Sequence, residues 1–195
     1  TQVRIAGRDG AAAKRLAARL GEEIDAPVDA APEFSAALAG ADVVCAATAA
    51  TEPVVRREWL AAGVHVNSVG YTTAGREVDA ETVRDALVVV ESRAAALAES
   101  NDIRWAIRDG IAEHDAVHAE LGELVSGRRP GRTAADQITL YKSLGVAAED
   151  DAAAALVLAA AERDELGRLV DLTCRRDVGS SPANAAGTIA AAPPA

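Results

Sequence analysis

Short apolar runs alternate with helix-like segments along the N-terminal half of this chain, and that alternation constrains its fold more than any other feature. The runs that predict strands are residues 3–6, 41–47, 64–69 and 86–90, and Val28 seeds a further short one. The segments that predict helices between them are residues 11–20, 32–38 and 53–62. Alternation at this spacing predicts an α/β fold on a parallel, helix-covered sheet. The unbroken apolar run at 41–47, which holds Cys45, predicts a strand buried on both faces.

The C-terminal half has a different pattern. It predicts a charged helical region at 101–127, followed by a basic turn at 128–132. A final strand at 137–141, a strand-to-helix junction at 143–145 and an alanine-rich helix at 146–162 come after it. After Thr173 the pattern dissolves into Arg, Gly, Ser, Pro and Ala. This composition predicts a disordered tail.

Composition excludes several classes of function. Half of the residues are hydrophobic and 26% are charged, which suffices for a core, while 3% aromatic residues leave that core to Ala, Val, Leu and Ile. The formal net charge of -10 argues against non-specific binding to nucleic acid or to an anionic membrane. No apolar run reaches the roughly 18 residues of a membrane span, and two cysteines make no disulfide framework. We therefore expect a soluble cytoplasmic protein.

The start of the chain is unusual. The sequence contains no methionine, and Thr1 lies almost inside the first expected strand. Processing or a cloning boundary would explain this, but we expect a fragment whose true beginning lies upstream.

Three loops that follow strands are candidate ligand sites, because a doubly wound sheet binds ligands beyond the carboxyl ends of its strands. In the first, Gly7-Arg8-Asp9, a basic residue stands close to the place where dinucleotide-binding folds carry an acid for the ribose. Arg8 therefore favours NADP(H), although a solvated turn arginine would look the same. The loops at 46–53 and 66–72 offer small residues, hydroxyls and Gly70 for close approach of a cofactor, or serve as plain turns.

Other chemistry finds little support in the sequence. No G-x-G-x-x-G follows a strand, so the usual pyrophosphate-binding turn is absent from this sequence. His114 and His118 have the spacing of one helix face, but with His65 they are the only histidines and no third ligand stands out, so we expect no metal. There is no G-x-S-x-G motif, and Cys45 is expected to be buried and inert.

An ordered set of motifs resembles the ornithine cyclodeaminase/mu-crystallin family over roughly residues 3–165. The matching stretches are Ala39–Val44, Ala47-Thr48, Thr51–Val54, Trp59-Leu60, Gly63–Gly70, Gly75–Asp79, Gly122–Leu124 with Gly127, Gly131-Arg132, Gln137–Gly145 and Glu149-Asp150. The resemblance implies a homodimeric NAD(P)-dependent oxidoreductase or deaminase that acts on small amino, keto or cyclic imino acids.

The resemblance also implies site residues. Thr48, Val69, Gly70 and Ser143 would contact the cofactor, and Leu144 would line the substrate pocket. It divides the chain into a partial, Rossmann-like NAD(P)-binding domain at 1–145, a helix at 146–171 that returns toward a missing N-terminal domain, and a disordered tail at 172–195.

The sequence departs from the family in two ways. Thr72 stands where cyclodeaminase-like members carry an acid/base aspartate, which disfavours ornithine cyclodeamination and leaves the catalytic residues unknown. The nearby Glu77 and Asp79 are interpreted as helix-start residues. The N-terminal portion, which carries the substrate carboxylate-binding residues, is missing, so we expect the chain alone to be inactive. A non-enzymatic NADPH-binding protein and a degenerate remnant are the alternatives.

Overall fold

Seven parallel strands form two sheets in the part of the chain that the computed structural model describes, residues 1–168 and 170. The two-stranded sheet pairs β1 with β2, and the five-stranded sheet has the order β3-β4-β7-β5-β6. The strands are β1 (Val3–Ile5), β2 (Val28–Ala30), β3 (Val43–Ala46), β4 (His65–Ser68), β5 (Leu87–Val90), β6 (Val117–Glu120) and β7 (Thr139–Lys142). The expected α/β architecture with a parallel sheet is confirmed.

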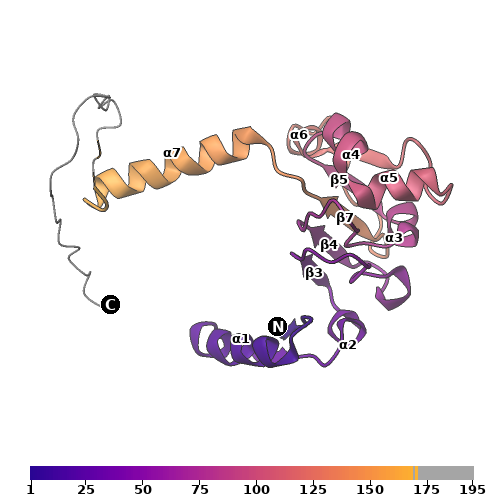
Figure 1. Cartoon of the computed structure of the whole chain (residues 1–195). Coiled ribbons are helices and arrows are strands. Elements are labelled where there is room, and N and C mark those ends of the chain that lie inside the picture. The colour runs from indigo at the N-terminus through magenta and orange to yellow at the C-terminus, as the bar shows by residue number, and fades with distance from the viewer. Residues whose placement is uncertain (169, 171–195) are drawn as a thin grey trace, which may run out of the picture. The chain divides into compact units, whose positions relative to one another are not determined.

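The helices alternate with these strands, as Figure 1 shows. They are α1 (Gly10–Glu23), α2 (Phe34–Leu38), α3 (Ala80–Asp85), α4 (Arg93–Glu99), α5 (Asn101–Arg108), α6 (Leu121–Val125) and α7 (Ala147–Arg163). Polar side chains cap several of them: Asp9 accepts hydrogen bonds from the first turn of α1, Ser92 from α4 and Ser100 from α5. None of the helices in the described residues is long and apolar enough to cross a membrane.

The core lies on one face of the five-stranded sheet. Alternate residues of its strands, among them Val66, Val88 and Leu140, pack there against buried side chains of α3 and α5 such as Val83 and Ile103. Each fully buried aliphatic side chain of this size stabilises the fold by about 1.5–3 kcal/mol. The core therefore fixes the strands from which the loops at the carboxyl edge emerge.

The opposite face of that sheet is only partly covered, which contradicts one expectation. Along β3 the side chains alternate between exposed and buried, and Val43 is 58% exposed. Cys45 shares that face and is exposed as well, so the prediction of a strand buried on both faces, with Cys45 inside it, is wrong. The reason is that successive side chains of a strand point to opposite faces, and the core covers only one of them here.

Two predicted helices are also wrong in part. Residues 53–62 contain only a 3₁₀ turn at Arg57–Trp59, because the N–H groups of Val54 and Val55 both donate to the Glu77 carbonyl and Val55 bridges Val78. Residues 101–127 are helical at α5 and α6, but β6 lies between them and pairs with β5. A positive φ of 70° at Gly110 follows the end of α5.

The chain separates into two units, residues 1–150 and 151–195, and most of α7 belongs to the second. The helix expected from Val146 to about Glu162 is confirmed as α7, where Leu156, Val157 and Leu158 are exposed. The disordered tail predicted at 172–195 lies outside the described residues.

Candidate functional site

Two of the expected loops, after β3 and β4, and the strand-to-helix junction after β7 lie at one edge of the five-stranded sheet. Ala46, Ser68 and Lys142 end three neighbouring parallel strands and stand side by side in register. The residues that follow them include Thr48, Gly70 and Ser143, so three predicted positions come from adjacent strand ends. The carboxyl edge of a parallel sheet is where such folds bind their ligands.

A cavity of about 600 Å³ joins the first two predicted loops. Gly7, Arg8 and Asp9 line it together with the segment at 47–52, which includes Thr48, and with Phe34 and Val54. Its volume lies within the range of small-molecule sites, and the 47–52 segment contributes small residues and Glu52 to its lining. Phe34 was not predicted as a site residue, because its spacing to Leu38 indicated only a helix face.

Asp9 and Arg8 have different roles in this loop. The Asp9 carboxylate accepts hydrogen bonds from the N–H groups of Ala11 and Ala12, at 2.9 and 3.0 Å, and so caps α1. Its negative charge is therefore already engaged by the helix. Arg8, the preceding residue, also lines the cavity.

The segment after β4 packs directly onto the Thr48 loop. Val69 is half exposed, whereas a side chain at Gly70 would overlap the Thr48 carbonyl oxygen and the Glu77 carboxylate. Gly70 is thus required for close approach of two loops rather than for a turn alone. Leu144 lines a small recess with Thr48, Gly70 and Thr72, so the predicted substrate-pocket residue lies beside the predicted cofactor residues.

Glu91, at the end of β5, holds the segment that contains Ser143 and Leu144. Its carboxylate accepts hydrogen bonds from the Tyr141 hydroxyl at 2.9 Å and from the Leu144 N–H at 3.2 Å. Burial opposes ionisation of Glu91, but hydrogen bonds from Ser143, Tyr141 and the backbone outweigh it and hold the pKa of this carboxyl below its ordinary value. Burial, and then the Glu91 carboxylate, raise the pKa of Tyr141.

Glu77 differs from its sequence-based interpretation more than any other residue named from the sequence. It was interpreted as a helix-start residue, but it is buried, with 2% of its surface exposed, and its carboxylate faces the loops after β3 and β4. Asp79 alone has the predicted role, because it caps α3 by accepting from the Thr82 N–H. No local pattern marks Glu77, since its partners lie 7 to 29 residues away in sequence.

A buried ion pair lies next to Glu77. Lys142 Nζ is 3.2 Å from Asp102 Oδ2, and both side chains are almost fully buried. Asp102 also accepts hydrogen bonds from the backbone N–H groups of Glu77 and Val78, while Lys142 donates to Ser68 and to the Gly70 carbonyl. Neither residue was singled out from the sequence as a site residue.

The histidines do not form the arrangement that their spacing indicated. His114 lies in the loop between α5 and β6, whereas His118 lies in β6 and donates to the Pro130 carbonyl. They therefore share no helix face. In the described part of the chain, no group of three or more His, Cys, Asp or Glu side chains has a geometry that could hold a metal ion.

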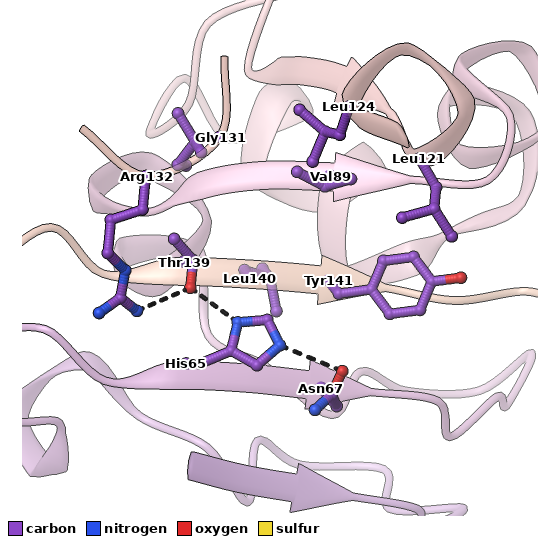
Figure 2. A pocket seen from close by; sticks show the side chains of 11 residues that line it. His65, Asn67, Val89, Leu121, Leu124, Gly131, Arg132, Thr139, Leu140 and Tyr141 are labelled. Carbon is purple, nitrogen blue, oxygen red and sulfur yellow. Dashed lines mark hydrogen bonds between the residues drawn. The ribbon is translucent and has the colours of Figure 1, made fainter. Parts of the chain in front are cut away.

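A second large cavity, of about 460 Å³, lies on the partly covered face of the sheet (Figure 2). Leu87, Val89, Leu121 and Leu124 contribute apolar walls to it. Four of its polar side chains are hydrogen-bonded to one another, since His65 contacts both Thr139 and Asn67 and Arg132 donates to Thr139. None of the predicted site residues lines it.

Comparison with known proteins assigns the family. The model of the ornithine cyclodeaminase/mu-crystallin family matches residues 1–165. The chain belongs to this family. The residues of the predicted loops, from Gly7 to Gly145, lie within the matched region.

Individual members of the family are similar to parts of the chain. The ketimine reductase mu-crystallin of Mus musculus is 43% identical over 122 residues, which are 62% of this chain and 36% of the relative. A Δ1-pyrroline-2-carboxylate reductase of Bacillus cereus is 42% identical over 112 residues, 56% of this chain and 34% of the relative. The structure of the Thermococcus litoralis Δ1-pyrroline-2-carboxylate reductase, in complex with NADH and L-proline, superposes with a TM-score of 0.82 at 34% identity, over 87% of this chain and 53% of that one. The chain thus spans about half or less of the length of these relatives.

Proposed function

We propose that this chain is the NAD(P)-binding portion of an oxidoreductase that acts on a small amino, keto or cyclic imino acid. The observation that carries the proposal is the 600 Å³ cavity that joins the Arg8 loop to the Thr48 loop at the carboxyl ends of parallel strands. The names of the relatives, a ketimine reductase and a Δ1-pyrroline-2-carboxylate reductase, support the substrate class.

Each predicted residue has a place in this proposal. Thr48 contacts the ribose or pyrophosphate, and Val69 and Gly70 line the nicotinamide. Ser143 contacts the cofactor, and Leu144 lines the substrate pocket. A bound nicotinamide would supply the hydride that is exchanged with the substrate carbon. The protein residues orient the two partners, and the catalytic residues remain unassigned.

The proposed cofactor preference is for NADP(H). Arg8 offers a guanidinium to a 2′-phosphate, and the carboxylate of Asp9 is engaged by α1 and does not compete for a ribose hydroxyl.

We also propose that residues 1–145 need further protein to act, and that α7 returns toward an N-terminal domain. Two observations support this: within the described residues β1 and β2 pair only with each other, and the match covers 36% of the mouse relative. The whole enzyme is proposed to be a homodimer. The cytoplasmic location expected from the sequence remains a prediction.

The experiment uses the full-length protein, including the further protein proposed above. It is titrated with NADPH and NADH, followed by nicotinamide fluorescence, and then assayed for turnover with cyclic imino, keto and amino acids. Saturable binding with oxidation of NADPH by a cyclic imino acid supports the proposal. Saturable binding without turnover favours the non-enzymatic NADPH-binding alternative, which the presence of Thr72 in place of a carboxylic acid allows. No saturable binding of either dinucleotide contradicts both and favours a degenerate remnant.

A further inference from the structure

The buried carboxylate of Glu77 joins two loops that the sequence places far apart. Oε1 accepts hydrogen bonds from the backbone N–H of Thr48 at 2.6 Å and from the Thr48 hydroxyl at 2.7 Å. Oε2 accepts from the Ser68 hydroxyl at 2.7 Å and from the backbone N–H of Gly70 at 3.0 Å. One oxygen therefore holds the loop after β3, and the other holds the end of β4 and the loop after it.

The position of Glu77 is itself fixed from several directions. Its N–H donates to Asp102 Oδ1 at 2.7 Å, and its carbonyl accepts from the N–H groups of Val54 and Val55. Asp102 is in turn paired with Lys142, which precedes Ser143 at the end of β7. The backbone that carries this carboxylate is thus tied to Asp102 and to the segment at Val54 and Val55.

A charged glutamate in this place is costly unless something compensates it. Four donors surround the carboxylate, and Lys142 reaches both Ser68 and the Gly70 carbonyl on the same side. An apolar side chain could fill the same space, but only a side chain with two acceptor oxygens can accept hydrogen bonds from both loops at once. We propose that Glu77 is a positioning residue, which fixes the Thr48 loop and the Gly70 loop in the arrangement that meets the dinucleotide.

The inference rests on the proposed cofactor site, but the chemistry of the four contacts makes it separately testable. All four partners are donors, so Glu77→Gln turns an NH₂ group toward two of them whichever way the amide faces. Asp79→Asn is the matched control, because it makes the same change two residues away. The Asp79 carboxylate accepts hydrogen bonds from the backbone N–H groups of Arg57 and Thr82 and not from the Thr48 and Gly70 loops.

The experiment compares wild type, Glu77→Gln and Asp79→Asn in the intact protein by three measurements. These are the dissociation constant for NADPH, amide hydrogen exchange at Thr48 and Gly70 without cofactor, and the midpoint of urea unfolding. We expect Glu77→Gln to exchange faster at both amides and to bind NADPH about tenfold more weakly or worse, because the competent loop arrangement is less populated. Asp79→Asn lowers the unfolding midpoint and leaves affinity and exchange at both amides unchanged.

Affinity and exchange equal to wild type in a folded Glu77→Gln protein overturn the proposal. The proposal is also overturned if Asp79→Asn loses as much NADPH affinity as Glu77→Gln does when the two variants are equally destabilised. If Glu77→Gln does not fold, Ser68→Ala decides instead, since it removes one donor to Oε2. Faster exchange at Gly70 supports the proposal, and unchanged exchange overturns it. If wild type binds no dinucleotide, the proposed function fails, and the exchange measurement still tests whether Glu77 holds the two loops.

Discussion

Lys142 and Asp102, from the end of β7 and the start of α5, form a buried ion pair whose Nζ and Oδ2 atoms lie 3.2 Å apart. The other carboxylate oxygen of Asp102 accepts hydrogen bonds from the N–H groups of Glu77 and Val78. The pair therefore ties the central strand to the segment that carries Glu77.

Removing one partner of this pair leaves a buried charge without compensation. We expect Lys142→Met to lower the free energy of unfolding by about 3–5 kcal/mol, measured by urea denaturation. The double variant Lys142→Met with Asp102→Asn should cost less than the sum of the two single variants, because the amide oxygen still accepts from the backbone and no charge remains. Strict additivity would contradict this account of the pair. Arg108→Met, which breaks an exposed pair with Asp109, is the control and should change little.

Gly70→Ala tests the close approach of the two loops. The new Cβ overlaps the Thr48 carbonyl oxygen and the Glu77 carboxylate, so we expect a loss of about 1–3 kcal/mol in unfolding free energy together with weaker NADPH binding. Gly122→Ala is the matched control, because a Cβ at this helical position meets nothing within 4 Å. It should be neutral or stabilising by up to about 1 kcal/mol. If Gly70→Ala behaved like Gly122→Ala, the described packing would be wrong.

Arg8→Asp tests the cofactor preference. The substitution removes the cation that lines the 600 Å³ cavity and introduces a carboxylate that repels a 2′-phosphate. We expect the ratio of NADPH to NADH affinity to fall by about tenfold or more, which corresponds to about 1.4 kcal/mol of differential binding. Arg15→Asp makes the same charge change at an exposed position of α1 and should leave the ratio unaltered. A ratio that Arg8→Asp does not change refutes the assignment of NADP(H).

Glu91→Gln tests the hydrogen bonds that hold the Leu144 segment. Because the folded-state pKa of Glu91 is lowered, its stabilising contribution is complete above the unfolded pKa of about 4.3 and is lost as the pH falls through the folded value. We expect the variant to be about 1–2 kcal/mol less stable than wild type near neutral pH, and the difference to close in acid. Glu99→Gln, at an exposed site on α4, is the control for denaturation curves recorded across this range. A difference that stays constant with pH would show that the charge of Glu91 is irrelevant.

The sequence predicts those parts of the fold that have a local signal. Leu87–Val90 is an apolar, β-branched run, and β5 forms there between β7 and β6. Val117–Glu120 (VHAE) mixes apolar and polar residues beside charged neighbours, so β6 has no such signal and depends on pairing with β5. Val54 and Val55 were assigned to a helix because nothing local shows where their N–H groups donate. Their acceptor is the carbonyl of Glu77, in a distant segment.

The candidate site divides in the same way. Arg8, Thr48 and Gly70 follow strands, and strand ends can be read from the sequence. Glu77, Asp102 and Lys142 acquire their roles only through contacts across long stretches of chain, such as the Lys142 to Ser68 hydrogen bond over 74 residues. Without that information, an acidic residue close to Asp79 is interpreted as a helix-start residue, and this is why Glu77 was misassigned.

The placement of β7 has a consequence for how the molecule is made. This strand comes late in the chain, yet it lies between β4 and β5, and Thr139 pairs with His65 and Leu87. On the ribosome, β4 and β5 are synthesised long before the strand that separates them, so their inner edges stay open until residue 142 has emerged. The sheet can therefore be completed only in a late, long-range step, and pairing of this kind is slow to form.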